Sequence, residues 1–199
     1  IYLSVSRPDD ENVHQRVFVR GLSFVILALD CMERAFEGEY RAKLVTCVQL
    51  LLRLEVPVTN GDEQSLFSTQ TADDPSPPEL DCQGAALLAL ARAAPWGDSE
   101  HQIRSAIRRG LRAILIVSIN GEQYDQPTLT YNTIAVRKQA GGSREDTGYW
   151  NFKLGLALRA FKAIQRVQEL GHLGLDQDTL DLLERLIERA EEALQPSLR

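Results

Sequence analysis

Acidic, aromatic and amide side chains gather in one segment of the chain. Its members are Glu145, Asp146, Tyr149, Trp150, Asn151 and Lys153. Carboxylates transfer protons in acid–base catalysis, and aromatic rings stack on the apolar faces of sugars. We therefore predict a carbohydrate site with Glu145 and Asp146 as catalytic groups and Tyr149, Trp150 and Asn151 as substrate contacts. The alternative is a capped helix start whose rings pack under a loop and whose lysine is solvated.

A second acidic cluster, Glu79, Asp81 and Gln83, follows the proline pair Pro77-Pro78. Hydrolysis of a glycosidic bond uses two carboxyl groups, one as acid and one as base or nucleophile. If both clusters face one cleft, each supplies one catalytic carboxylate, with Glu79 and Asp81 as the candidates here and Gln83 as a substrate contact. Against this, acidic residues in a first helical turn are favoured by the helix dipole without any function.

His14 and Arg16 form a third group near the start of the sequence. A lyase needs a base and a cation that neutralises a uronate carboxylate, so both are candidate substrate contacts. The alternative is a structural histidine on a helix. The three histidines are scattered, and no cluster has the spacing of metal ligands. Neither a metal nor a cofactor is predicted, and nucleotide-binding and zinc-protease motifs are absent from the sequence.

The elements that position these residues are predicted to be helices. Apolar residues recur at steps of three and four, which is typical of amphipathic helices. Asp176 is expected to cap the last helix and Gly38 to end the first. The predicted helices cover approximately residues 10–36, 39–54, 79–94, 99–116, 147–170 and 177–194.

Long connections separate three pairs of helices. Residues 58–78 contain proline and Asn-Gly turn signals and are predicted to be a loop. β-Rich runs at 116–119, 129–131 and 133–136 surround a second Asn-Gly pair, which predicts a small β-hairpin inside the second long loop. Loops of this length within a compact domain are usually functional.

A motif with glycine followed by small and aliphatic residues occurs at the start of the first helix in each pair. The glycines are Gly21, Gly84 and Gly155. Repeats of this kind define an architecture. The small residues predict close packing within an inner layer of first helices, and the charged second helices are predicted to form an outer layer.

This pattern resembles the α/α-toroid superfold, in which helical hairpins form inner and outer rings and loops at one end shape a cleft. The segments 81–88 and 146–153 look like the inner helix starts of carbohydrate-active members. The resemblance implies an all-α fold of three antiparallel hairpins, which is a partial toroid. The length of the chain predicts one domain over residues 1–199. Because a full toroid has about six hairpins, the chain is expected to be half of a ring, cut from a longer chain, or an open helical array.

Composition limits the partners that we expect. The 199-residue chain has 44% hydrophobic and 25% charged residues and a net charge of −6. An acidic protein is a poor nucleic-acid binder, and the basic residues Arg104, Arg108, Arg109 and Arg112 have the spacing of a solvated helix face. No apolar run reaches the length of a membrane span, so a soluble protein is expected, in a compartment that the sequence leaves open.

Two functions follow as hypotheses. The first is a carbohydrate-active domain that cleaves a glycosidic bond in an oligo- or polysaccharide, as a hydrolase or a lyase. The second is a non-catalytic helical scaffold that binds a protein or glycan partner through its loops.

Overall fold

A computed structural model describes residues 18–58, 63–68, 79–96, 100–120, 133–138 and 144–194 of the chain. Within these ranges, the backbone alone is described at 116–120, 133, 135–138 and 144–151. His14 and Arg16 lie outside the described residues.

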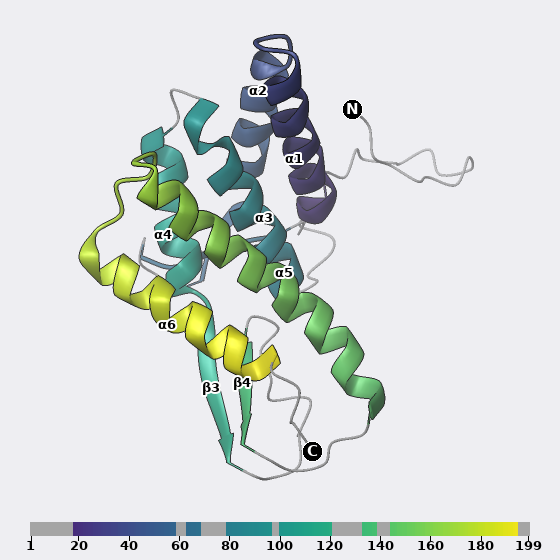
Figure 1. Ribbon diagram of the computed structural model, residues 1–199, viewed down its shortest axis with the longest axis vertical. Helices are drawn as coiled ribbons and strands as arrows, with labels where there is room; N and C mark the ends of the chain where they lie inside the picture. Colours follow the sequence, from purple (N-terminus) through teal and green to yellow (C-terminus); the bar gives the residue numbers. More distant parts are fainter. Residues whose placement is uncertain are drawn as a thin grey trace.

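The described part of the chain is mainly helical (Figure 1). The helices are α1 (Val19–Ala35), α2 (Arg41–Leu52), α3 (Leu80–Ala93), a 3-10 turn η1 (Ala94–Trp96), α4 (Glu100–Arg112), α5 (Arg144–Glu169) and α6 (Gln177–Leu194). The strands are β1 (Glu55–Pro57), β2 (Ser65–Phe67), β3 (Leu115–Asn120) and β4 (Thr133–Lys138).

The helices pack as three consecutive pairs, α1 with α2, α3 with α4, and α5 with α6. The first link contains Glu37 and Gly38, both with positive φ, so α1 ends where Gly38 predicted. Gly171 and Gly174 have positive φ in the link between α5 and α6. Asp176 caps α6 as predicted, because its Oδ1 accepts hydrogen bonds from the N–H and hydroxyl of Thr179 at 2.9 and 2.8 Å.

The helix α3 lies at the centre of the fold, in contact with both α1 and α5 (Figure 1). Nearly every side chain of α3 is buried. Most of its residues are alanine, leucine or glycine, which allows the helix to be buried on all sides. Residue 84 is a glycine where α3 meets α5. A Cβ at that position would lie 2.8 Å from the backbone nitrogen of Ala157. The predicted close packing is thus present at this glycine.

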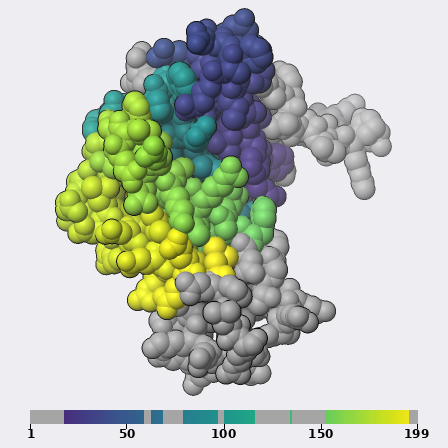
Figure 2. All heavy atoms as spheres, in the orientation of Figure 1, coloured from purple at the N-terminus to yellow at the C-terminus, as the bar shows by residue number. Residues whose placement is uncertain are grey.

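Figure 2 shows the face of the molecule that α5 and α6 form, with α1 and α2 at its upper end. The core beneath is continuous. Its largest fully buried side chains include Phe67, Phe161, Ile26, Leu44, Leu87, Leu90, Ile103 and Ile107. No helix in the described ranges is both long enough and apolar enough to cross a membrane.

The strands correct two predictions. The segment predicted as an unbroken loop contains β2, which pairs antiparallel with β1 from Glu55↔Phe67 to Pro57↔Ser65. The predicted hairpin after α4 is wrong, because β3 and β4 pair in parallel from Leu115↔Thr133 to Asn120↔Lys138. The residues between them, 121–132, have about the length that a parallel crossover needs, whereas a hairpin would have paired strands next to the Asn-Gly turn.

Candidate functional site

The starts of α1 and α3 meet in an ion pair. Nη1 of Arg20, in the first turn of α1, donates a hydrogen bond to Oδ2 of Asp81 at 2.6 Å. The Asp81 side chain is 1% exposed, whereas that of Arg20 is 51% exposed. The contact joins residues that are 61 positions apart, so it places the predicted catalytic residue Asp81 where two helix starts converge.

One oxygen atom of Asp81 has no partner among the described residues. Oδ1 is buried and accepts no hydrogen bond from any described residue. A buried carboxylate oxygen with no donor is costly, because water no longer solvates it. The position in the first turn of α3 offsets part of this cost through the helix dipole. This oxygen is the acceptor at the site that a ligand or a proton would satisfy.

Glu79 connects the start of α3 to α5. Its Oε2 lies 2.9 Å from Nζ of Lys153, whose side chain is buried. The buried ion pair contradicts the alternative in which Lys153 is solvated. It brings the second predicted acidic cluster next to the third turn of α5, so the starts of α1 and α3 lie beside the N-terminal half of α5.

Gln83 faces the interior instead of a cleft. Its Oε1 accepts a hydrogen bond from the N–H of Phe67 at 2.8 Å, and its Nε2 donates one to the carbonyl of Phe67 at 2.7 Å. Both ends of the buried amide thus bind the backbone of β2. This geometry anchors β2 to α3 through the buried Gln83 side chain.

Glu145, Asp146, Tyr149, Trp150 and Asn151 belong to the first turns of α5. Their side chains lie outside the described part of the structure, so their predicted roles stay predictions. Their backbone continues the helix that carries Lys153. Asp146 precedes Lys153 by seven residues, which is about 10 Å along a helix axis.

Cys82 reports on the charges at this site. Burial, followed by the negative charge of Asp81, raises the pKa of Cys82 from 9.0 to about 11. At pH 8 we expect its alkylation to be about a hundredfold slower than that of an ordinary thiol, because only the thiolate reacts. D81N removes a charge that opposes ionisation, so it should lower this pKa and speed the reaction. R20Q should do the opposite, because the Arg20 cation lowers the pKa.

The measurement is the pH dependence of iodoacetamide labelling, followed by mass spectrometry at each cysteine. Cys31 is free and exposed and serves as the internal reference. D178N, at an exposed position in the first turn of α6, is the matched control. Equal labelling of Cys82 in the parent and in D81N would contradict the described proximity.

The sequence analysis missed a cluster at the opposite ends of α1 and α3. Asp30 is fully buried, and its carboxylate accepts hydrogen bonds from Arg34, Arg92 and Trp96. The guanidinium carbon of Arg34 lies 5.0 Å from the centre of the Trp96 ring, which is a cation–π geometry. The available signal was an aspartate on the apolar face of a predicted helix, directly after Leu29.

Charged groups also fix β1 and β2 against α4. Arg109 binds Glu55 through two hydrogen bonds of 2.7 Å, and Ser65 donates a third bond to the same carboxylate. Bidentate pairs of this kind are strong and directional. The sequence predicted that Arg109 lies on a solvated helix face. Instead, Arg109 helps to hold β1 and β2 against α4.

In the described ranges, no three histidine, cysteine or acidic side chains lie together in a way that would hold a metal ion. No family model matches the chain, and no curated protein and no solved structure matches it.

Proposed function

We propose that the end of the protein where α1, α3 and α5 begin is a carbohydrate site that cleaves a glycosidic bond. The observation that carries this proposal is the Asp81 carboxylate at the meeting point of two helix starts, with Oδ1 unpartnered among the described residues. Glycosidases require a carboxylate held at a fixed position and a second one across the substrate.

The roles of the carboxylates follow from their partners. Asp81 faces the Arg20 cation and suits the part of base or nucleophile, which must be ionised. The proton donor then comes from a different acid, for which Glu145 and Asp146 at the start of α5 are the candidates. Glu79 holds Lys153 and positions α5 against α3. Tyr149 and Trp150 would stack on the sugar, and Asn151 would bind its hydroxyl groups.

The packing of the helices supports the same proposal. In an α/α toroid the first helix of each hairpin belongs to the inner ring, and the cleft lies at one end of that ring. Here the first helices α1, α3 and α5 contact one another through α3. We infer that the chain is a partial toroid of three hairpins, with α2, α4 and α6 in the outer layer.

The test is turnover of a broad panel of neutral and uronic-acid oligosaccharides. New reducing ends report hydrolysis, and ultraviolet absorbance of an unsaturated product reports elimination. We expect D81N and D146N each to lower turnover by about a hundredfold or more, because each removes a proton-transferring group. D178N is the matched control and should keep the parental rate.

Thermal melting of each variant separates loss of function from loss of fold. The proposal is overturned if the parent chain turns over none of the panel, or if folded D81N and D146N keep the parental rate.

A non-catalytic scaffold is the second candidate, and one observation favours it. Both carboxylates at the start of α3 already have a cationic partner, and Asp81 is buried, which is what a structural pair requires. This function predicts glycan or protein binding without turnover. Binding of an oligosaccharide that is never cleaved, with D81N affecting the melting temperature alone, would favour the scaffold over the enzyme.

A further inference from the structure

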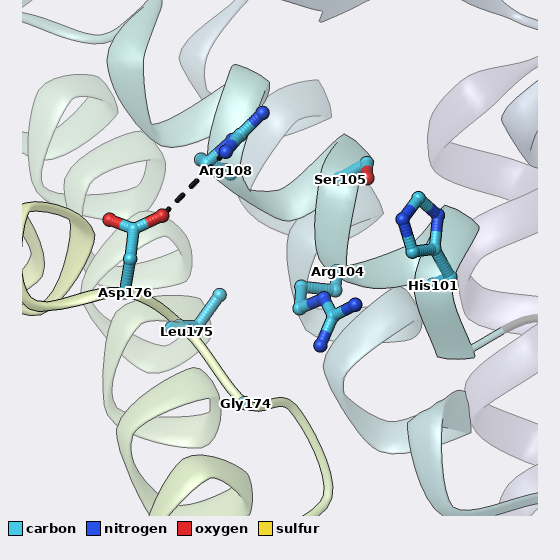
Figure 3. A pocket seen from close by; sticks show the side chains of 7 residues that line it. All are labelled: His101, Arg104, Ser105, Arg108, Gly174, Leu175 and Asp176. Atoms are coloured by element: carbon cyan, nitrogen blue, oxygen red, sulfur yellow. Dashed lines mark ion pairs between the residues drawn. The ribbon is translucent and has the colours of Figure 1, made fainter.

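A hollow of about 350 Å³ lies between α4 and the link from α5 to α6 (Figure 3). One wall is formed by His101, Arg104, Ser105 and Arg108, and the other by the link residues Gly174 to Asp176. Its volume is within the range of small-ligand pockets. The hollow lies beside the end of α5, whereas Lys153 marks the other site. Glu169 follows Lys153 by 16 positions, which is about 24 Å along the helix.

The four α4 side chains share one face of the helix. Relative to His101, the others follow at three, four and seven residues, which is the spacing of neighbours on a helical surface. Figure 3 shows them opposite Gly174, Leu175 and Asp176. Residue 174 is a glycine with φ of +57°, and a Cβ there would lie 3.1 Å from Nη1 of Arg104. The missing side chain thus leaves room for the Arg104 guanidinium at the mouth of the hollow.

Several donors in this hollow have no acceptor among the described residues. Within the described part of the chain, His101, Arg104 and Ser105 make no side-chain hydrogen bond or ion pair. Nε of Arg108 is buried and has no acceptor among the described residues. The single ion pair of Arg108 is long, with Nη1 at 3.7 Å from Oδ2 of Asp176. A buried N–H without an acceptor is unfavourable, so an incoming anion would gain from satisfying these groups.

A second hollow, between α4 and the residues at the end of α2, provides a contrast. It has about 390 Å³ and shares His101 and Ser105 with the first. Two arginines, Arg53 and Arg109, line it, and Arg109 is bound to Glu55 by two short hydrogen bonds, so that cation is already neutralised. Nε of Arg108, the buried donor without an acceptor among the described residues, belongs to the first hollow and not to the second.

The charges in the first hollow favour an anion. Arg104 and Arg108 contribute two positive charges, and Asp176 contributes one negative charge. Hydrogen bonds from Thr179, together with the nearby Arg108 and Arg112, hold the pKa of Asp176 below its ordinary value, so it stays ionised at neutral pH. Asp176 therefore competes with any bound anion for Arg108.

We propose that this hollow binds the phosphate or sulfate group of a small ligand. Two guanidinium groups on one helix face, a hydroxyl and an imidazole surround a single space, which matches the several acceptor oxygens of a tetrahedral oxyanion. The site is separate from the proposed carbohydrate site, and neither proposal depends on the other.

The test uses pyrophosphate, inorganic phosphate and sulfate as probes, with acetate at matched ionic strength as the carboxylate comparison. Binding is followed by calorimetry and by amide resonances of the full chain. We expect the phosphate probes to shift resonances of α4 near Arg104 and of the link near Leu175. R104Q should bind about tenfold more weakly, because it loses a charge-assisted hydrogen bond. Among the described residues Arg104 makes no side-chain hydrogen bond or ion pair, so R104Q is expected to fold, and its melting temperature checks this.

R189Q is the matched control, because Arg189 is exposed on α6 and pairs with Glu192. It should bind like the parent. The proposal is overturned if no probe shifts these resonances at about 10 mM, a concentration that detects millimolar affinity. It is equally overturned if R104Q and R189Q bind alike, or if acetate binds as well as phosphate.

A substitution at Asp176 is expected to strengthen anion binding, whereas R104Q weakens it. D176N removes the competing charge and keeps a good helix cap, since asparagine is also favoured at that position. We expect about fivefold tighter pyrophosphate binding, which is the size of a surface ion pair that no longer competes. Weaker or unchanged binding by folded D176N would contradict the assigned role of Arg108.

Discussion

Replacing Gly84 by alanine is expected to destabilise the protein by about 1–3 kcal/mol, although alanine is the better helix former. The added Cβ would lie 2.8 Å from the nitrogen and 2.9 Å from the Cα of Ala157, and 3.0 Å from the carbonyl carbon of Leu156. All three are backbone atoms, which cannot move aside as a flexible side chain does. Helices α3 and α5 must therefore separate, and the tightly packed core around α3 loses contacts.

Gly155 provides the matched control on the same helix as Ala157. A Cβ at Gly155 meets no atom within 4 Å. G155A should therefore stabilise the protein by about 0.5–1 kcal/mol, because alanine loses less conformational entropy in a helix than glycine does. The two variants make the same chemical change in helices that touch, yet their expected effects have opposite signs.

Urea unfolding followed by circular dichroism measures both effects. We expect a lower midpoint for G84A and a higher midpoint for G155A, with similar slopes. Equal midpoints for the two variants would show that α3 and α5 are not in close backbone contact at Gly84.

The same pair of glycines shows what the repeated motif could predict. Its small residues correctly indicated close packing at Gly84, where α3 is buried on all sides. At Gly155 the motif indicated the same packing, but the space around that residue is open, and the neighbouring Ala157 approaches α3. A local pattern identifies a helix that can pack closely, and the rotation of the partner helix decides which residue is in contact.

The helices were predictable because their signals are local. Apolar periodicity, the cap at Asp176 and the stop at Gly38 involve residues within one or two turns. The end of α4 was placed too late, because Leu115 and Ile116 continue the apolar pattern but belong to β3. Those residues pair with Thr133 and Ile134, and no local feature of the sequence indicates such a distant partner.

The sequence named the acidic residues of the candidate site but not their contacts. The acidic start of α3 was singled out by its position one turn before Gly84. Its partner Arg20 is 61 residues away, and the burial of Lys153 beside Glu79 depends on how α5 crosses α3. Ion pairs between distant segments follow from the packing, so the sequence could name these side chains but not pair them.

A buried aspartate forms an ion pair at each end of the contact between α1 and α3. Asp81 is paired with Arg20 at one end, and Asp30 is paired with Arg34 and Arg92 at the other. The two carboxylates differ in how many of their oxygens accept hydrogen bonds. Both oxygens of Asp30 do, whereas Oδ1 of Asp81 has no donor among the described residues. A fully satisfied pair stabilises the fold, and an unsatisfied one is typical of a functional position. This difference supports the proposal of a site at Asp81.

Asp30 is accordingly expected to matter for stability, and D30A should lower the free energy of unfolding by about 3 kcal/mol. The substitution leaves the indole N–H of Trp96 without its acceptor at 2.6 Å and removes the link between α1 and η1. Arg34 and Arg92 are 44% and 41% exposed, so water resolvates both cations and holds the loss near the lower end of the range for broken buried pairs.

Urea unfolding of D30A, R92A and the double variant measures how strongly the two side chains depend on each other. We expect the double variant to be more stable than the sum of the single losses predicts, because each substitution removes the same contact. D181A is the matched control, since Asp181 accepts one exposed hydrogen bond from Gln177 and should change stability by less than about 0.5 kcal/mol. If D30A unfolds at the same urea concentration as D181A, the Asp30 cluster does not hold α1 against the end of α3.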